Sequence, residues 1–253
     1  MSAFDLTGRV ALVTGGNGGI GLGMARGLAK AGASLVIVGR NAAKNEAALA
    51  ELTALGAPCC AAQVDIADEA ACRAMAGIAQ DRFGRLDILV NNAGIGRGGR
   101  PETISVADWH AVMQTNLTAA MIACQGAYPL MKTAGGGKII NIASGYAIFG
   151  AAHVAAYAAS KGGLVQLTKS LAVAWAPDNI QVNAVIPGWI ATDMTRAAHE
   201  SSAFTARVVA RTPAGRWGEP ADLEGPAAFL ASAASDFVTG HALIVDGGHA
   251  ISA

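Results

Sequence analysis

The stretch RVALVTGGNGGIG, residues Arg9–Gly21, decides the fold of this chain. Its first half is an apolar, β-branched run typical of a strand, and its second half is a glycine-rich turn that opens directly into a segment of helical period. Glycines let the backbone turn sharply and approach a pyrophosphate closely, and the free N–H groups at the start of a helix then face the anion. Gly16, Gly18 and Gly21 also fit the GxGxxG pattern, so the loop has two registers. This order of strand, loop and helix predicts a nucleotide site at the first strand–helix junction.

The same alternation of short β-rich runs and longer Ala/Leu-rich segments continues along the chain. Nearly continuous apolar runs, typical of parallel strands covered on both faces, predict seven strands: Arg9–Thr14, Ser34–Gly39, Cys59–Val64, Asp87–Asn91, Lys138–Ala143, Gln181–Ile186 and Ala242–Val245. Helical periodicity predicts six helices: Ile20–Ala31, Ala42–Leu55, Asp68–Phe83, Val106–Met131, Ala155–Ala176 and Ala221–Ser232. Alternating strands and helices imply right-handed βαβ units and a doubly wound α/β sheet.

We interpret residues 1–253 as one domain, because the chain shows no linker, low-complexity tract or internal repeat. One stretch, residues 189–217, departs from the alternation, with Thr, Arg, Ser, His and Pro scattered among apolar residues. A long irregular insertion that follows the carboxyl end of a strand is typically functional. We therefore expect residues 189–217 to form a lid over the ligand crevice.

The composition points away from several classes of protein. Lys and Arg together number 18, as do Asp and Glu, so the balance of charge gives no attraction to nucleic acid or to an anionic membrane. The four cysteines form no CxxC pair and no His cluster has zinc-ligand spacing, so we expect no metal: Cys59, Cys60, Cys72 and Cys124. The N-terminus lacks a signal-peptide pattern, and no apolar run approaches the roughly 20 residues of a membrane span. We expect a cytoplasmic protein.

The end of the second predicted strand bears on the choice of nicotinamide cofactor. NAD-binding units usually carry an acidic residue there for the ribose hydroxyls, but the chain has no Asp or Glu between Asp5 and Glu46. Arg40 stands instead where a guanidinium meets a 2′-phosphate, and Lys44 follows one helical turn on. The pattern favours NADP(H), with NAD(H) as the alternative.

Two residues on one predicted helix form a candidate acid/base pair. Tyr157 and Lys161 are four apart, which places them on the same helix face. A phenol is a poor base at neutral pH, and a nearby ammonium is expected to lower its pKa. Ser144 ends the strand Lys138–Ala143, at the edge of the sheet where such folds bind ligands, and its hydroxyl is suited to hold a substrate oxygen.

Six motifs in order make the chain resemble the short-chain dehydrogenase/reductase family over essentially its whole length. They are Thr14-Gly15-x-x-x-Gly19-x-Gly21, Asn91-Asn92-Ala93-Gly94, Asn116, Ser144, Tyr157-x-x-x-Lys161 and Pro187-Gly188. The resemblance implies a Rossmann-like, doubly wound domain with a seven-stranded parallel sheet in the order 3-2-1-4-5-6-7, flanked by helices. It also implies an NAD(P)(H)-dependent oxidoreductase that interconverts a secondary alcohol and a ketone, and a homotetramer.

The resemblance assigns roles residue by residue. Tyr157 would be the general acid/base, Lys161 would lower its pKa and hold the nicotinamide ribose, Ser144 would orient the substrate oxygen, and Asn116 would support a water in a proton relay. Hydride would pass directly between cofactor and substrate carbon, which needs no metal. The remaining cofactor contacts would be Gly15, Asn17, Gly18, Gly19, Ile20, Gly21, Arg40, Asn41, Asp65, Ile66, Asn92, Ala93, Gly94, Pro187, Gly188, Ile190 and Thr192. NADP-using relatives often carry a second basic residue in the glycine loop, where this chain offers only Asn17, which leaves dual specificity open.

The substrate is less well determined by the sequence. Tyr146 and Trp189 flank the expected pocket, as do Ile148 and Met194. The chain resembles sugar-acid and polyol dehydrogenases, and also 3-oxoacyl reductases, so a small ketone, cyclic alcohol, polyol or sugar acid is expected. A 3-oxoacyl thioester reductase is the alternative, although only Lys132 and Lys138 could attract an acidic carrier protein near the Ser144 strand. A nucleotide-sensing protein without turnover is an alternative of another class.

Overall fold

A computed structural model describes residues 2–252, and its centre is one seven-stranded sheet. All strands are parallel and lie in the order β3-β2-β1-β4-β5-β6-β7, which confirms the predicted topology. The strands are β1 (Val10–Thr14), β2 (Ser34–Gly39), β3 (Cys59–Gln63), β4 (Ile88–Asn91), β5 (Gly137–Ile142), β6 (Ile180–Pro187) and β7 (Ala242–Val245). Each lies within a residue of its predicted bounds; the strands β1, β2, β4, β5 and β6 are buried almost throughout, which leaves a clear apolar run in the sequence.

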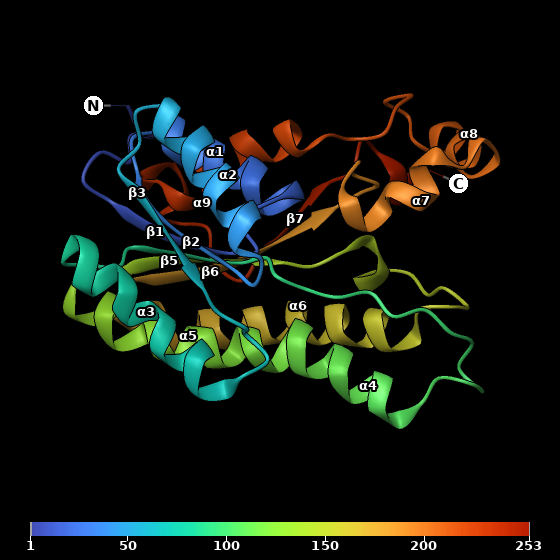
Figure 1. Cartoon of the computed structure of the whole chain (residues 1–253), viewed down its shortest axis with the longest axis horizontal. Coiled ribbons are helices and arrows are strands. Elements are labelled where there is room, and N and C mark those ends of the chain that lie inside the picture. Colours follow the sequence, from blue (N-terminus) through green and yellow to red (C-terminus); the bar gives the residue numbers. More distant parts are fainter. Residues whose placement is uncertain (1, 253) are drawn as a thin grey trace.

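Helices cover both faces of the sheet (Figure 1). The helices α1 (Gly19–Lys30), α2 (Ala42–Ala54) and α9 (Glu224–Ala231) lie on one side, and α3 (Glu69–Phe83), α5 (Ala119–Thr133) and α6 (Ala155–Trp175) lie on the other. Alternate residues of β1 serve the two cores: Ala11 and Val13 pack in one, Val10 and Leu12 in the other. The central strand is thus buried on both faces and holds the glycine loop rigidly at its carboxyl end.

Two predicted helices differ from the structure. The segment Val106–Met131 is broken into α4 (Val106–Met113), a π-helical turn (Gln114–Thr118) and α5. The predicted helix Ala221–Ser232 begins only at Glu224, after the 3₁₀ turn Pro220–Leu223. Pro220 has no N–H and stands at the first position of that turn, where such a residue is tolerated.

The expectation of an irregular stretch at residues 189–217 is wrong in one respect. This segment contains a 3₁₀ turn (Asp193–Thr195) and two short helices, α7 (Arg196–Glu200) and α8 (Ser202–Arg211). Figure 1 places α7 and α8 at one end of the molecule, away from α3 and α5. Both helices are mostly exposed; α7 has only five residues, which is too short for periodicity to reveal, whereas α8 carries Phe204 and Val208 four apart on one face, a helical signal that the sequence did offer.

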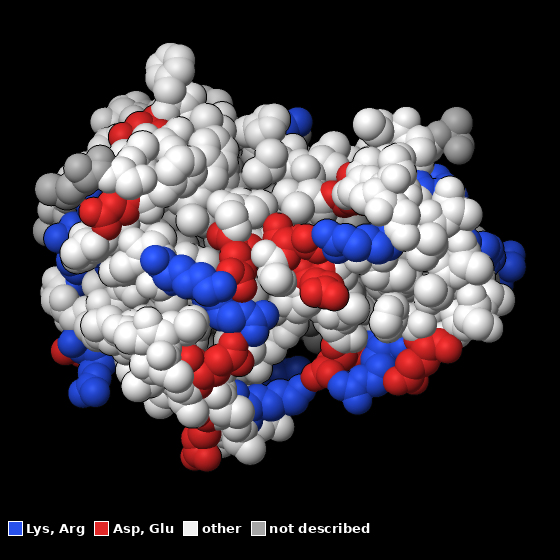
Figure 2. Space-filling view, turned by 90° about the horizontal axis from the view of Figure 1, so that it is seen from above, with Lys and Arg blue, Asp and Glu red and all other residues white. Residues whose placement is uncertain are grey.

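The surface above α1, α2 and the 189–217 segment carries charges of both signs. Figure 2 shows Lys and Arg side chains beside Asp and Glu side chains on this face. Ion pairs made by α1 include Arg26 with Glu51 and Lys30 with Glu224. In residues 2–252, no helix is both long and apolar enough to cross a membrane.

Candidate active site

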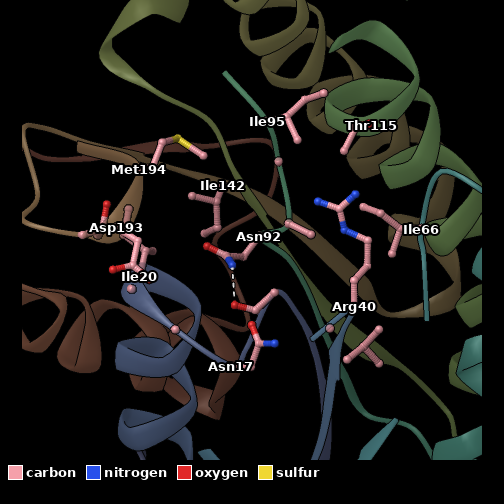
Figure 3. A pocket seen from close by; sticks show the side chains of 18 of the residues that line it. Asn17, Ile20, Arg40, Ile66, Asn92, Ile95, Thr115, Ile142, Asp193 and Met194 are labelled. Carbon is pink, nitrogen blue, oxygen red and sulfur yellow. Dashed lines mark hydrogen bonds between the residues drawn. The ribbon is translucent and has the colours of Figure 1, made fainter. Parts of the chain in front are cut away.

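A cavity of about 320 Å³ opens at the carboxyl ends of the central strands. Figure 3 shows Arg40 and Ile66 on one side of it and Asp193 and Met194 on the other. The predicted residues that line it are Gly15, Asn17, Gly18, Gly19, Ile20, Arg40, Asp65, Ile66, Asn92, Ala93, Gly94, Tyr157, Lys161 and Thr192. One continuous space therefore connects the glycine loop with the predicted acid/base pair.

The glycine loop forms a close-packed floor at one part of this cavity. An added Cβ at Gly21 would lie 2.3 Å from the carbonyl oxygen of Gly15, which is too close for any other residue. Gly19 has φ +51°, and its missing Cβ leaves room for the Thr192 side chain, which would otherwise stand 3.1 Å away. The helix α1 begins at Gly19 with no side chain capping its N-terminus. This shape suits a pyrophosphate held by backbone N–H groups.

The two predicted basic residues, Arg40 and Lys44, both line the cavity. Arg40 Nη1 lies 3.9 Å from Asp65 Oδ2, and both side chains are largely exposed to the cavity and solvent. Asn41 does not line the cavity: its Oδ1 accepts the Lys44 N–H at 3.0 Å and so begins α2. Lys44 is thereby placed one turn into α2, at the cavity rim. A phosphate monoester fits beside Arg40 and Lys44 on charge grounds.

The segment after β4 is tied to the end of β1. Asn92 Nδ2 donates to the carbonyl oxygens of Thr14 and Gly15 at 3.0 and 3.1 Å. The Thr14 hydroxyl accepts the backbone N–H groups of Asn92 and Ala93 at 3.0 and 3.1 Å. These bonds close the space between the two strands and hold Gly94 at the cavity wall.

The predicted reacting centre is assembled by β5 and α6. Tyr157 and Lys161 lie on α6 as the four-residue spacing predicts, and Lys161 Nζ stands 5.6 Å from the centre of the Tyr157 ring. Lys161 is buried, and its Nζ donates to the carbonyl oxygen of Ile142, the last residue of β5, at 2.7 Å. Ser144 lies two residues beyond that carbonyl, close enough to Tyr157 for its hydroxyl to affect the phenol.

Burial dominates the pKa values of this pair. The pKa of Lys161 falls to about 8 because its ammonium has lost its hydration. The pKa of Tyr157 is raised because burial disfavours its phenolate, although a hydrogen bond with Ser144 opposes the shift. Lys161 Nζ bonds to Ile142 and lies 5.6 Å from the centre of the Tyr157 ring, and its predicted lowering of the Tyr157 pKa stays a prediction. At neutral pH Tyr157 is a neutral phenol, which is the form that can donate a proton to a carbonyl.

Asn116 occupies the π-helical turn between α4 and α5. Its Oδ1 accepts the Ile95 N–H at 2.8 Å, and its Nδ2 donates to Ile95 O at 3.0 Å and to Ser160 Oγ at 3.1 Å. A small cavity of about 10 Å³ lies between Asn116 and Lys161, which is roughly the space one water needs. The predicted water relay stays a prediction, and the geometry shows that Asn116 also fixes the loop that bears Ile95.

Several predicted residues lie outside the main cavity. Pro187 and Ile190 are buried in the fold, and the backbone of Gly188 packs against Asp246, where a Cβ would stand 2.7 Å from the Asp246 Cα. Cavity residues that we did not predict include Val38, Gly39, Val64, Ile95, Thr115, Ile142, Ala143 and Asp193. Most of them end a strand or directly follow one, so their position at the carboxyl edge of the sheet was the available signal.

An aromatic wall stands beside Tyr157. Tyr146 packs edge-on against both Tyr157 and Trp189, with ring centres 6.2 and 6.3 Å apart. Trp189 in turn packs against Phe204 of α8 and against Trp217, with centres 4.9 and 5.5 Å apart. Tyr146 and Trp189 thus connect the reacting centre with the 189–217 segment, whereas Ile148 is half exposed.

Comparison with known proteins identifies relatives along nearly the whole chain. Residues 15–250 match a family model described as enoyl-(acyl carrier protein) reductase. The 2-dehydro-3-deoxy-D-gluconate 5-dehydrogenase of Escherichia coli (strain K12) is 43% identical over 249 residues, covering 98% of each chain. The gluconate 5-dehydrogenase of Gluconobacter oxydans (strain 621H) is 42% identical over 250 residues, covering 98% of this chain and 97% of its own.

A solved structure shows the same fold. The gluconate 5-dehydrogenase of Burkholderia cenocepacia J2315, crystallised with NADP and tartrate, superposes with a TM-score of 0.94 at 43% identity, covering 99% of this chain and 98% of its own. These matches confirm the predicted family: the chain belongs to the short-chain dehydrogenases/reductases and is an oxidoreductase of that family.

Proposed function

We propose that this member of the short-chain dehydrogenase/reductase family interconverts a secondary hydroxyl and a ketone on a sugar acid, using NADP(H). The observation that carries the proposal is the single cavity that joins Arg40, the glycine loop and Tyr157. A dinucleotide laid along it from Arg40 would bring its reactive end to the phenol.

The residues at the reacting end suit carbonyl reduction. NADPH supplies the hydride when it is bound. The Tyr157 phenol holds a proton at neutral pH and donates it to the carbonyl oxygen, and Ser144 orients that oxygen. Lys161 places a positive charge beneath the Tyr157 ring and stabilises negative charge that develops on the phenol. In the reverse direction the same phenol accepts the proton of an alcohol.

NADP(H) is favoured by Arg40 and Lys44 together. Both line the end of the cavity where a 2′-phosphate would lie, and Asp65 at 3.9 Å orients Arg40 without burying it. The Burkholderia cenocepacia enzyme crystallised with NADP supports this choice.

A sugar acid is favoured by the relatives and by the aromatic wall. The E. coli and G. oxydans enzymes are named for gluconate-type acids, and the B. cenocepacia enzyme holds tartrate, a hydroxy acid. Tyr146 and Trp189 offer ring faces and edges against which the C–H groups of a sugar chain can pack.

The alternative 3-oxoacyl thioester reductase loses support from the two lysines that could attract a carrier protein. Lys132 Nζ pairs with Asp178 at 3.0 Å, and Lys138 Nζ pairs with Asp236 at 2.7 Å. Both ammonium groups already lie against carboxylates, which lessens their attraction for an acidic partner.

The 189–217 segment is proposed as the lid over the substrate. Trp217 is 93% buried there, yet its Nε1 has no hydrogen-bond partner among residues 2–252. Trp217 packs against Trp189 with ring centres 5.5 Å apart, which joins the segment to the aromatic wall beside Tyr157 and supports a lid at this position.

The proposed enzyme is a homotetramer in the cytoplasm. Exposed apolar side chains lie on α6 (Val173), on the edge strand β7 (Ile244) and near the chain end (Ile251), which supports a homotetramer that covers them. The four cysteines are free thiols, which supports a cytoplasmic protein.

The test is turnover of NADPH with a panel of ketones that includes 5-keto-D-gluconate, uncharged keto sugars and 3-oxoacyl thioesters. We expect the acid to react fastest, and NADH to react more slowly than NADPH. A preference for the thioester would contradict the substrate class. Binding of NADPH without turnover of any substrate, in either direction, would instead support a nucleotide sensor.

A further inference from the structure

The basic residues at the 2′-phosphate end of the cavity are each held by a carboxylate. Arg40 directly follows β2, and it faces Asp65, which lies two residues beyond the end of the neighbouring strand β3. Lys44 reaches much further: its Nζ lies 2.5 Å from Oδ2 of Asp193, which is 149 residues away in the sequence and belongs to the 3₁₀ turn before α7. Lys44 and Asp193 both line the cavity, and Figure 3 shows Asp193 on the side opposite Arg40. The Lys44–Asp193 ion pair therefore connects the cofactor end with the start of the proposed lid.

The first residues of the proposed lid contact both the phosphate loop and Asp193. Thr192, the residue before Asp193, packs directly on Gly19 of the phosphate loop. Asp193 also pairs through Oδ1 with Arg196, the first residue of α7. A change in the partner of Asp193 therefore acts on the first turn of the lid, and Thr192 keeps that turn close to the cofactor.

The Lys44–Asp193 ion pair is weak enough for a phosphate to replace Asp193 as the partner of Lys44. The side chains of Lys44 and Asp193 are 52% and 57% exposed, and such surface pairs are weak because water competes for both charges. A phosphate monoester carries nearly two negative charges and three acceptor oxygens, so it attracts an ammonium more strongly than a single carboxylate does. The anionic Asp193 is moreover a like charge to any phosphate placed beside Lys44.

We propose that Asp193 is a specificity-determining residue that holds Lys44 in the free enzyme, and that the 2′-phosphate of NADP(H) takes Lys44 from it and releases the start of the lid. NAD(H) lacks that phosphate and leaves the pair intact. The inference rests on the proposed use of NADP(H). It predicts that the Lys44–Asp193 ion pair affects both the preference for NADP(H) over NAD(H) and the mobility of the lid.

The first test is a binding cycle without substrate. Dissociation constants for NADPH and NADH are measured by fluorescence titration for the wild type, Asp193→Asn, Lys44→Met and the double variant. We expect Asp193→Asn to tighten NADPH by about two- to fivefold with little change for NADH, since it frees Lys44. In the Lys44→Met background the same substitution is expected to have no selective effect. Equal tightening of both cofactors by Asp193→Asn, which simple repulsion of the pyrophosphate predicts, would overturn the proposal.

The second test follows the lid itself. Trypsin cleavage after Arg196, Arg207 and Arg211 is timed at saturating NADP⁺ and at saturating NAD⁺. We expect faster cleavage with NADP⁺ in the wild type, and equal rates with the two cofactors in Asp193→Asn and in Lys44→Met. Equal rates in the wild type would contradict release of the lid. Failure to turn over sugar acids would leave both tests unaffected, whereas failure to bind NADPH would defeat the proposed function first.

Discussion

The chain buries two lysines at opposite ends of the same strand. Lys138 is the second residue of β5, and its Nζ pairs with Asp236 at 2.7 Å. Lys161 reaches the other end of β5 from α6, and its Nζ bonds at 2.7 Å to the carbonyl of Ile142, a neutral group. Both residues are more than 90% buried, yet Lys138 has a counter-ion and Lys161 has none among residues 2–252.

The difference separates a structural charge from a functional one. Burial lowers the pKa of both lysines, but Asp236 opposes the shift at Lys138, whereas nothing comparable acts at Lys161, whose pKa falls to about 8. A buried charge without a partner is costly, and folds retain it where chemistry needs it. The carboxyl end of the sheet is thus the reactive end and the amino end is a support.

Tyr157→Phe should lower turnover by about 10²- to 10⁴-fold, because it removes the only proton that the phenol can donate at the reactive end. NADPH should still bind, since the ring and its packing remain. Steady-state kinetics and fluorescence titration measure the two effects. Tyr146→Phe is the matched control, as its ring packs against Tyr157 at 6.2 Å. Undiminished turnover in the Tyr157→Phe variant would place the chemistry elsewhere.

Lys161→Met should lower turnover by about 10²-fold, because the positive charge beneath the Tyr157 ring is lost at the point where negative charge develops. Lys138→Met, the same substitution at the other end of β5, should leave turnover nearly unchanged. Parallel measurements of kcat for both variants decide the matter. Similar losses of kcat in Lys161→Met and Lys138→Met would contradict the proposal that only the carboxyl end of the sheet is reactive.

The stability of the wild type should rise with pH from about pH 8 towards pH 10.5 relative to Lys161→Met. The folded pKa of Lys161 is about 8 and its ordinary value is 10.5, so the unfolded chain binds more protons at this residue within that window. The charged form penalises folding below pH 8, and the penalty disappears as pH rises, by roughly 3 kcal/mol at most. Urea denaturation midpoints on either side of the window test it. Parallel pH profiles of wild type and variant would mean that Lys161 titrates normally.

Lys138→Met should have the smallest effect, a loss of about 1 kcal/mol in the free energy of unfolding. Asp236 is 65% exposed, so water hydrates its carboxylate once the lysine is gone, and the methionine replaces most of the apolar packing. Urea denaturation at neutral pH measures the loss. A loss of several kcal/mol would show that the amino end depends on its ion pair much more than the exposure of Asp236 indicates.

Much of the fold was predictable because strands that are covered by helices have runs of apolar residues in the sequence. The bounds of β2 and β7 agree with the prediction at both ends, and the glycine loop was placed by its position between strand and helix. The π-helical turn at Asn116 was not predictable, since an inserted residue leaves helical periodicity almost unchanged on each side of it. The helix α7 was missed because it has only five residues, and α8 was missed although Phe204 and Val208 lie four apart on one face of it.

The candidate site divides along similar lines. Residues carried by motifs, such as Tyr157, Lys161 and Asn92, line the cavity, and Asn41 does not because it caps α2 instead. Asp193 was not foreseen, since its pairing with Lys44 depends on how two distant segments meet. The raised pKa of Tyr157 could not be predicted either, because it depends on how deeply the phenol is buried, and residue spacing in the sequence does not show that.

The strand order has a consequence for how the chain acquires its structure. On one side β1 pairs with β2, which follows soon after it, but on the other side Ala11 pairs with Ile88 of β4, 77 residues later. During synthesis the first three strands therefore emerge with one edge of β1 unpaired until β4 arrives. Such non-local pairing slows folding and leaves an aggregation-prone intermediate. The yield of folded protein should therefore depend on growth temperature and on chaperone supply.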